Sequence, residues 1–268
     1  MCATIALAQF SAAGDPAVNL ETIAFYAGQA GFARADLLVL PEYGMGYPKK
    51  GGDFPAGQTL DGPFAAGLCA LARQHGLYIA CGLLERTGGD KLYNTTVLID
   101  RDGHIVRAHR KTHLFCSPSF QESDHFLPGD RLFQPVDTDF GRLGLLVCYE
   151  IRFPELARLQ VLDGAQLLVV CSAFVAGPGK NAQWHTLLNA RAIENGVFVC
   201  AADHTKPHVF LGESCAYDPV GTPLGSLGAA EGMLMVRCDV ENLDAYRTQN
   251  PAILQRRASL YQMKDGRS

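Results

Sequence analysis

Three residues that could together hydrolyse an amide, Glu42, Lys111 and Cys148, each follow a segment with the character of a β-strand. A free thiol with a pKa of about 8.5 is mostly protonated at pH 7, so a cysteine nucleophile needs a neighbouring carboxylate to take its proton. When the thiolate attacks an amide carbon, negative charge collects on the oxygen, where a positioned donor such as a lysine stabilises it. The residue types therefore suit hydrolysis of a C–N bond, if the fold brings them together.

Cys148 lies where a predicted strand meets a predicted helix. Residues 143–147 are apolar and short enough for a buried strand, and apolar residues recur at helical spacing between 153 and 162, after a proline near the first turn. A side chain at such an elbow is exposed at the carboxyl end of a sheet, beside backbone N–H groups of the following turn. The alternative is that Cys148 is a buried structural thiol, because free cysteine is among the most buried residue types.

The two other chemical groups also lie at strand ends. Residues 36–40 (D-L-L-V-L) predict a buried parallel strand that ends on Pro41-Glu42. Lys111 ends another strand pattern and precedes the loop 116–129, which contains Glu122. Taken singly, Glu42 and Glu122 could equally be loop acids, and Lys111 an exposed surface charge. Together they predict a site built from the ends of several strands.

The rest of the chain alternates strand and helix patterns. Strands are expected at 4–10, 78–84, 93–99, 104–109, 166–171, 197–202, 209–217 and 233–238, and helices at 20–30, 64–75 and 184–195. The segment 43–63, with six glycines and three prolines, predicts a long loop over the strand that carries Glu42. Turn signals occur at 101–103 and at 218–221 (D-P-V-G), between strands. Ala173 and Phe174 follow the strand 166–171 and become candidate substrate contacts.

Composition and charge limit the possible partners. The chain has 268 residues and a net charge of -4, with 48% hydrophobic and 19% charged residues, so we expect neither a nucleic-acid nor a membrane partner. No linker is evident, and we expect one domain over 1–268, in which 242–268 forms a C-terminal docking arm. The nine cysteines are an odd number without a C-x-x-C, which suits a reducing compartment and predicts a cytoplasmic protein.

Histidine spacing raises the possibility of a metal site. His109 and His113 are four residues apart, as are His204 and His208, but this spacing presents two ligands on one face only in a helix. Pro207 interrupts the second pair, and the first lies in a strand-like region. Because the cysteine spacing of a zinc knuckle and an H-E-x-x-H motif are also missing, we expect no metal and disfavour a metallohydrolase.

Several segments carry a family resemblance when they are taken together. They are L-V-L-P-E-Y, H-R-K-T-H-L-F and L-L-V-C-Y-E-I-R-F-P-E-L around the three chemical groups, with F-Q-E-S-D-H-F-L-P-G, A-R-A-I-E-N, D-P-V-G and Q-R-R-A-S-L-Y elsewhere. In this order and spacing they resemble the nitrilase superfamily, the carbon-nitrogen hydrolases, over nearly the whole chain. The resemblance implies an α/β fold, a single-domain α-β-β-α sandwich, and an enzyme without an organic cofactor.

The resemblance also implies roles for the residues. A small carboxamide would be cleaved to a carboxylate and ammonia through a thioester on Cys148, with Glu42 as the base. Lys111 and the backbone N–H of Tyr149 would stabilise the oxyanion, and Glu122 would orient Lys111 and the substrate amide. A homo-oligomer is expected, paired through the helix that follows Cys148.

Substrate choice depends on two residues beside the nucleophile. Tyr149 resembles the amidase branches, whereas nitrile-hydrolysing relatives typically have tryptophan there. Arg152 is at a position similar to an arginine that N-carbamoyl amino acid hydrolases use on the substrate carboxylate, and its guanidinium suits such a group. The alternative is an internal ion pair of Arg152 with Glu150 or Glu155.

Departures from the family pattern leave other activities open. Cys116 replaces the aspartate that commonly follows H-L-F, the loop to Glu122 is short, and 183–185 read Q-W-H where amidases often have H-W-E. These changes lie in loops that shape a substrate pocket. The alternatives to an amidase are an N-carbamoyl amidohydrolase, a nitrilase, or a non-catalytic binding protein with the same fold.

Overall fold

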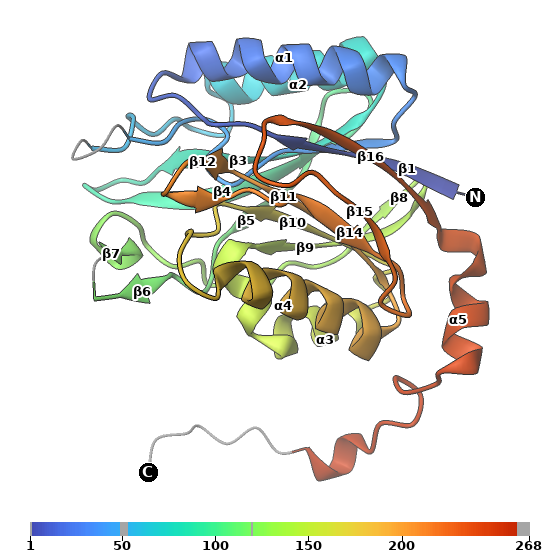
Figure 1. Ribbon diagram of the computed structural model, residues 1–268. Helices are drawn as coiled ribbons and strands as arrows, with labels where there is room; N and C mark the ends of the chain where they lie inside the picture. The colour runs from blue at the N-terminus through green and yellow to red at the C-terminus, as the bar shows by residue number, and fades with distance from the viewer. Residues whose placement is uncertain (1, 49–52, 119, 262–268) are drawn as a thin grey trace.

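The computed structural model describes residues 2–48, 53–118 and 120–261, and its centre is a pair of six-stranded sheets (Figure 1). The first sheet has the order β16 (Gly232–Asp239), β1 (Cys2–Gln9), β2 (Leu37–Val39), β3 (Tyr78–Arg86), β4 (Leu92–Ile99) and β5 (Ile105–Arg110). The second has the order β15 (Pro223–Ser226), β14 (Cys215–Tyr217), β11 (Phe198–Asp203), β10 (Leu167–Ser172), β9 (Gly141–Val147) and β8 (Val136–Thr138).

Helices cover the outer face of each sheet. The helices α1 (Pro16–Phe32) and α2 (Pro63–His75) lie on the first sheet, and α3 (Pro154–Leu162) and α4 (Lys180–Asn195) on the second (Figure 1). The fold is thus the predicted α-β-β-α sandwich. None of the helices within the described ranges combines the length and the apolar character needed to cross a bilayer.

Shorter elements complete the chain. They are the hairpin of β6 (Cys116–Ser117) and β7 (Phe120–Gln121), the hairpin of β12 (Thr205–Lys206) and β13 (Phe210–Leu211), the helix α5 (Leu243–Gln249), and the 3-10 turns η1 (Glu122–Asp124), η2 (Cys148–Arg152), η3 (Val240–Asn242) and η4 (Ala258–Leu260). Both hairpins lie at the same end of the sandwich (Figure 1). The chain continues after α5 along α3 and α4, where Ile253 packs against the core, and residues 262–268 of the predicted arm lie outside the described residues.

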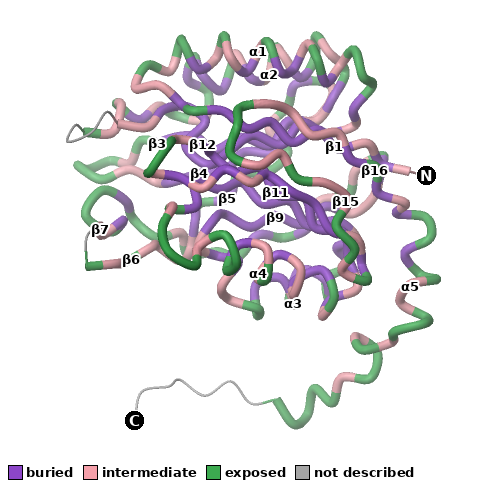
Figure 2. Tube along the Cα trace, viewed as in Figure 1, coloured by how far each residue is buried: buried purple, intermediate pink, exposed green. Residues whose placement is uncertain are grey.

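The strands that end at the site run in the same direction within each sheet. In the first sheet β1, β2 and β3 are parallel, and β5, which is antiparallel to β4, runs in the direction of β3. In the second sheet β9, β10 and β11 are parallel. Every residue of β2 and β10 is buried, as their uninterrupted apolar segments predict (Figure 2). The carboxyl ends of these strands can therefore contribute to one site.

The region after β11 departs from the sequence prediction. The strand expected at 209–217 is broken into β13 and β14 by two residues in the left-handed region, Gly212 (φ 73°) and Glu213 (φ 67°). The turn at 218–221 joins β14 to β15, not to the strand expected at 233–238, which is β16 and pairs antiparallel with β1 in the other sheet. The turn signal was local, whereas the partner of β16 is more than 200 residues away in the chain.

Candidate active site

Cys148 occupies a strained elbow. It follows the last residue of β9 directly, begins η2, and has a φ of 46°, in the left-handed region that side chains other than glycine rarely adopt. The first N–H groups of a helical turn have no partner within it, so the backbone N–H of Tyr149 is available to a ligand. Such strain is characteristic of functional sites because the surrounding structure must hold it in place.

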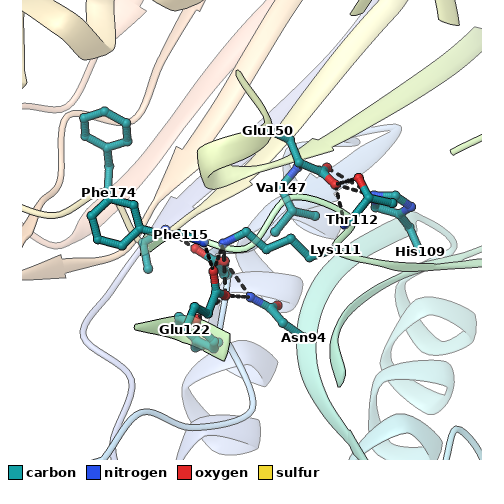
Figure 3. Close-up of polar contacts among 12 residues, drawn as sticks. Asn94, His109, Lys111, Thr112, Phe115, Glu122, Val147, Glu150 and Phe174 are labelled. Carbon is teal, nitrogen blue, oxygen red and sulfur yellow. Dashed lines mark hydrogen bonds and ion pairs between the residues drawn. The ribbon is translucent and has the colours of Figure 1, made fainter. Parts of the chain in front are cut away.

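Glu150 fixes the elbow to the neighbouring strand end. Its buried carboxylate accepts the backbone N–H of Val147 (2.9 Å), the N–H and the hydroxyl of Thr112 (2.8 and 2.7 Å), and His109 Nε2 (3.1 Å; Figure 3). Burial alone would raise the pKa of Glu150, but the attraction of His109 and these hydrogen bonds lower it to about 2. Since Lys111 lies between His109 and Thr112, this network also anchors the segment that carries the lysine.

A close backbone approach positions Glu42. A Cβ atom on Gly82 of β3 would lie 2.8 Å from the Tyr43 nitrogen and 2.9 Å from the Glu42 Cα, so glycine is required for the loop after β2 to pack there. Tyr43 has a φ of 57°, and the N–H of Glu42 donates to the Ser172 carbonyl oxygen at 3.3 Å. The loop is therefore held against the end of β10, and the Glu42 carboxylate is only 1% exposed.

Lys111 joins two buried carboxylates. Its Nζ lies 2.9 Å from Glu42 Oε1 and 2.8 Å from Glu122 Oε2, and all three side chains are at most 2% exposed. Asn94 Nδ2 donates to both glutamates, at 2.7 and 2.9 Å (Figure 3). Burial lowers the pKa of Lys111, but the negative charges of Glu122 and Glu42 raise it by more than burial lowers it. The lysine is therefore a cation.

The two carboxylates differ in their readiness to take a proton. Glu122 also accepts the Tyr43 hydroxyl (2.9 Å) and the backbone N–H of Phe115 (2.6 Å). Burial raises its pKa, but Lys111 and these donors lower it overall. For Glu42, burial outweighs the attraction of Lys111, and the charge of Glu122 raises its pKa further. Two carboxylates whose pKa values are pushed apart mark separate roles: Glu42 can exchange a proton, while Glu122 stays ionised.

Cys148 is a neutral thiol at rest. Burial raises its pKa well above the usual value, and the charge of Glu42 adds to this, while Lys111 opposes it. The thiol therefore needs a base to become a nucleophile, and Glu42 has the raised pKa that suits the exchange.

The predicted site residues line one cavity of about 420 Å³. It is bounded by Glu42, Lys111, Glu122, Cys148, Tyr149, Arg152, Ala173 and Phe174, all predicted from the sequence, and by Tyr43, Tyr47, Phe115, Ser117, Phe120, Val175, Lys180, His208, Val209 and Phe210. The backbone N–H of Ala173 donates to Glu42 Oε2 at 2.9 Å. A larger hollow of about 770 Å³ runs beside β5, but its lining has no cysteine and no lysine.

Two cations without a counter-charge lie on one side of this cavity. The Arg152 guanidinium and the Lys180 ammonium lie 5.5 and 5.6 Å from the centre of the Phe174 ring. Arg152 donates to Gln183 Oε1 at 2.7 Å, and neither cation forms an ion pair within 2–48, 53–118 and 120–261. The alternative, an ion pair of Arg152 with Glu150 or Glu155, is not formed among the described residues: Glu150 is engaged by His109, Thr112 and Val147, and Arg152 donates to the neutral Gln183.

Sequence reasoning missed Asn94, Tyr43 and Lys180. Asn94 begins the polar run N-T-T inside the buried strand β4, and this run was a usable signal. Tyr43 follows Glu42 directly, but the sequence predicts only a loop for residues 43–63 and gives no sign of the Tyr43 hydrogen bond to Glu122. Lys180 gave no signal, because α4 begins there and not at the predicted Trp184.

The histidine pairs have other partners. His109 contacts Glu150, His113 stacks on Phe153 with ring centres 4.0 Å apart, and His204 Nε2 accepts the backbone N–H of Ala12 at 3.0 Å. Over the described residues, the potential metal ligands that converge are Asp100, Asp102 and His104, which sit in the turn between β4 and β5 and do not line the cavity.

Comparison with known proteins agrees with this geometry. The profile of the family described as carbon-nitrogen hydrolase matches residues 4–248. The chain is 34% identical to the omega-amidase of Mus musculus, over 96% of each chain. It is also 34% identical to the deaminated glutathione amidase of Bos taurus, over 96% of this chain and 83% of that one. A solved structure of a glutamate-to-glutamine mutant of the amidase from Nesterenkonia sp. AN1, with acrylamide added at its active-site cysteine, matches with a TM-score of 0.80 and 30% identity, over 96% of this chain and 98% of that one.

Proposed function

The chain belongs to the carbon-nitrogen hydrolase family, and we propose that it hydrolyses a small carboxamide to a carboxylate and ammonia with Cys148 as the nucleophile. The observation that carries the proposal is the buried Lys111 ammonium, bound to both Glu42 and Glu122 beside the strained Cys148 elbow. A buried charge cluster of this kind is costly to maintain and is typical of a catalytic site.

The first half of the reaction forms a thioester. Glu42 takes the Cys148 proton, and the thiolate forms a C–S bond with the amide carbon while the C=O π pair moves to oxygen. Lys111 and the Tyr149 N–H stabilise this oxyanion, and one such donor contributes about 100- to 1,000-fold in rate. The oxyanion then re-forms the carbonyl as the C–N bond breaks, and ammonia leaves with the proton that Glu42 holds.

The second half releases the acid. Glu42, again a carboxylate, takes a proton from water, and the hydroxide attacks the thioester carbon. Collapse of this intermediate breaks the C–S bond, and the thiolate recovers the proton from Glu42. Glu122 takes no proton in either half, because its five hydrogen-bond donor contacts hold it as an anion that fixes Lys111.

The cavity walls favour a substrate that carries a carboxylate. Arg152 and Lys180 supply two positive charges that have no acidic partner in the part of the chain that the structure describes. The ring centres of Tyr149 and Phe174 lie 5.9 and 5.5 Å from the Arg152 Cζ. The relatives named omega-amidase and deaminated glutathione amidase support an amide as the bond that is cleaved. An N-carbamoyl acid is the second candidate, favoured by the planar guanidinium of Arg152.

Ammonia release across matched substrates tests this proposal. Mono-amides of dicarboxylic acids are compared with uncharged amides of equal length, with N-carbamoyl acids and with nitriles. We expect the mono-amides to be turned over fastest, with a lower KM than their uncharged analogues. Equal KM values for charged and neutral amides would show that the site does not recognise a substrate carboxylate. Faster hydrolysis of nitriles than of amides would overturn the amidase assignment.

Two substitutions test whether each of the two cations binds the substrate carboxylate. Arg152→Leu and Lys180→Met are each expected to raise KM for the charged amide by about tenfold, the loss of one charge-assisted contact, with little change for the neutral amide. Arg131→Leu, outside this cavity, is the control and leaves both KM values unchanged. A uniform loss with both substrates would mean that the cations shape the cavity without binding a carboxylate.

We also propose a homo-oligomer in a reducing compartment such as the cytoplasm. Large apolar side chains are exposed on α3, α4 and the segment after α5, namely Leu159, Leu162, Ile193, Leu254, Leu260 and Tyr261. Leu254 is 82% exposed, although the neighbouring Ile253 packs against the core. A second copy seated on α3 and α4 would cover these side chains. All nine cysteines are free, which fits reducing conditions.

A further inference from the structure

Two buried polar residues lie behind Cys148 at the carboxyl ends of β10 and β11. Ser172 ends β10, Asp203 ends β11, and the two are directly paired in the parallel register. Both are fully buried, and Ser172 is a close neighbour of both Cys148 and Asp203. The Ser172 carbonyl oxygen also accepts the N–H of Glu42, so this strand end forms a wall of the site.

Each of the two side chains keeps an unpaired polar atom. Asp203 Oδ1 accepts the backbone N–H of Phe174 at 2.8 Å. Asp203 Oδ2 and the Ser172 hydroxyl lie close enough to interact, as do the Ser172 hydroxyl and Cys148, but within the described residues neither oxygen has a partner in full hydrogen-bond geometry. Buried polar atoms without a partner are rare. Two of them on directly paired residues beside a nucleophile suggest a contact that forms when the sulfur becomes charged.

Asp203 is a neutral acid. Burial raises its pKa well above the usual value, and the charge of Glu42 adds to this. Glu42 and Cys215 are titratable groups that interact electrostatically with Asp203, and neither is a cation. The neighbouring His204 is neutral as well, because burial lowers its pKa to about 3. Because Oδ1 is occupied as an acceptor, the proton belongs on Oδ2.

We propose that Asp203 and Ser172 are positioning residues of a hydrogen-bond chain in which Asp203 Oδ2–H donates to Ser172 Oγ, and the Ser172 hydroxyl donates to the Cys148 thiolate. A hydroxyl has a single hydrogen, so by accepting from Asp203 it directs that hydrogen to the sulfur. A donor to the charged sulfur favours the thiolate both when it attacks and when it leaves. The inference rests on Cys148 being the nucleophile of the proposed function.

Alkylation of Cys148 by iodoacetamide as a function of pH tests this chain without relying on turnover. Mass spectrometry of the Cys148 peptide gives the midpoint at which the thiolate forms, and the exposed Cys116 in the same sample is the internal reference. Ser172→Ala is expected to raise the midpoint by about one pH unit, a tenfold loss of thiolate below it, because a hydrogen bond to a charged group is lost. The Cys116 midpoint stays unchanged.

Two substitutions of Asp203 test whether its side chain is a protonated acid that donates a hydrogen bond or an ionised carboxylate. Asp203→Asn keeps an N–H donor at the Oδ2 position, so the Cys148 midpoint is expected to match wild type. Asp203→Leu removes the donor and raises the midpoint; if it fails to fold, Ser172→Ala and Asp203→Asn decide the matter. An unchanged midpoint in Ser172→Ala, or a lowered midpoint in Asp203→Asn, as loss of a negative charge would give, overturns the proposal. Failure of the proposed function would show differently, as retained turnover in Cys148→Ala.

Discussion

Replacing Glu150 by glutamine tests how the elbow is held. The wild-type carboxylate accepts hydrogen bonds from Val147, Thr112 and His109, which join the end of β9 to the segment of Lys111. Its pKa falls from 4.5 to about 2. At about 1.4 kcal/mol for each pKa unit, this shift corresponds to roughly 3 kcal/mol of folding stability. Glutamine has one acceptor oxygen and adds two hydrogens that face donors.

The sign of the pH dependence follows from the direction of the shift. A carboxyl group with a lowered folded pKa contributes fully above its unfolded pKa of 4.5, and the contribution is lost as the pH falls towards about 2. Glu150→Gln should therefore be roughly 3 kcal/mol less stable than wild type at pH 7, and the gap should narrow below pH 4.5.

Urea unfolding followed by circular dichroism at pH 7, 4 and 3 measures this gap. Glu155→Gln, which changes an exposed carboxylate at the start of α3, is the matched control and should stay within about 0.5 kcal/mol of wild type at every pH. A gap for Glu150→Gln that is the same at pH 7 and pH 3 would refute the reasoning, because the loss would then come from packing and not from ionisation.

Further predictions concern the position of the base, the amide between the carboxylates, the assembly and metals. Gly82→Ala should lower kcat at least about tenfold by displacing Glu42. Gly88→Ala, whose Cβ would meet nothing within 4 Å, is the control and should not change kcat. Equal kcat values for the two variants would show that the contact of Gly82 with the Glu42 loop does not position the base. Asn94→Ala should lower kcat/KM by about tenfold or more, because its amide group donates to both glutamates, and a kcat/KM equal to that of wild type would contradict this. Light scattering at micromolar concentration should give at least a dimer, and Leu162→Glu should weaken it; a monomeric wild type would exclude the pairing. Dialysis against a strong chelator should leave the rate unchanged, and a loss restored by zinc would show a metal requirement.

The positions of the residues that follow recognisable strand patterns could be predicted from the sequence. Glu42, Lys111 and Cys148 each follow a strand whose length and polarity are readable, and parallel strands bring their carboxyl ends together, so their meeting in one cavity could be anticipated. The layered sandwich followed from the family resemblance and is confirmed by the structural match.

Non-local packing accounts for what was missed. Asn94 reaches Glu42 and Glu122 only because β4 pairs with β3 and β5, and nothing in its local sequence specifies those partners. The pairing of Ser172 with Asp203 depends on the register of β10 and β11. Arg152 was left between two interpretations because the decision depended on whether Glu150 was already occupied, which is a property of the folded elbow.

The central claim is that Cys148 carries the acyl group. Wild-type protein mixed with a mono-amide substrate is quenched in acid within the first turnovers, digested, and its peptides are measured by mass spectrometry. We expect the mass of the acyl group on the Cys148 peptide of the wild-type protein. A folded Cys148→Ala variant should show neither this adduct nor ammonia release. Ammonia release by Cys148→Ala at the wild-type rate, or an acyl group on another residue, would contradict it.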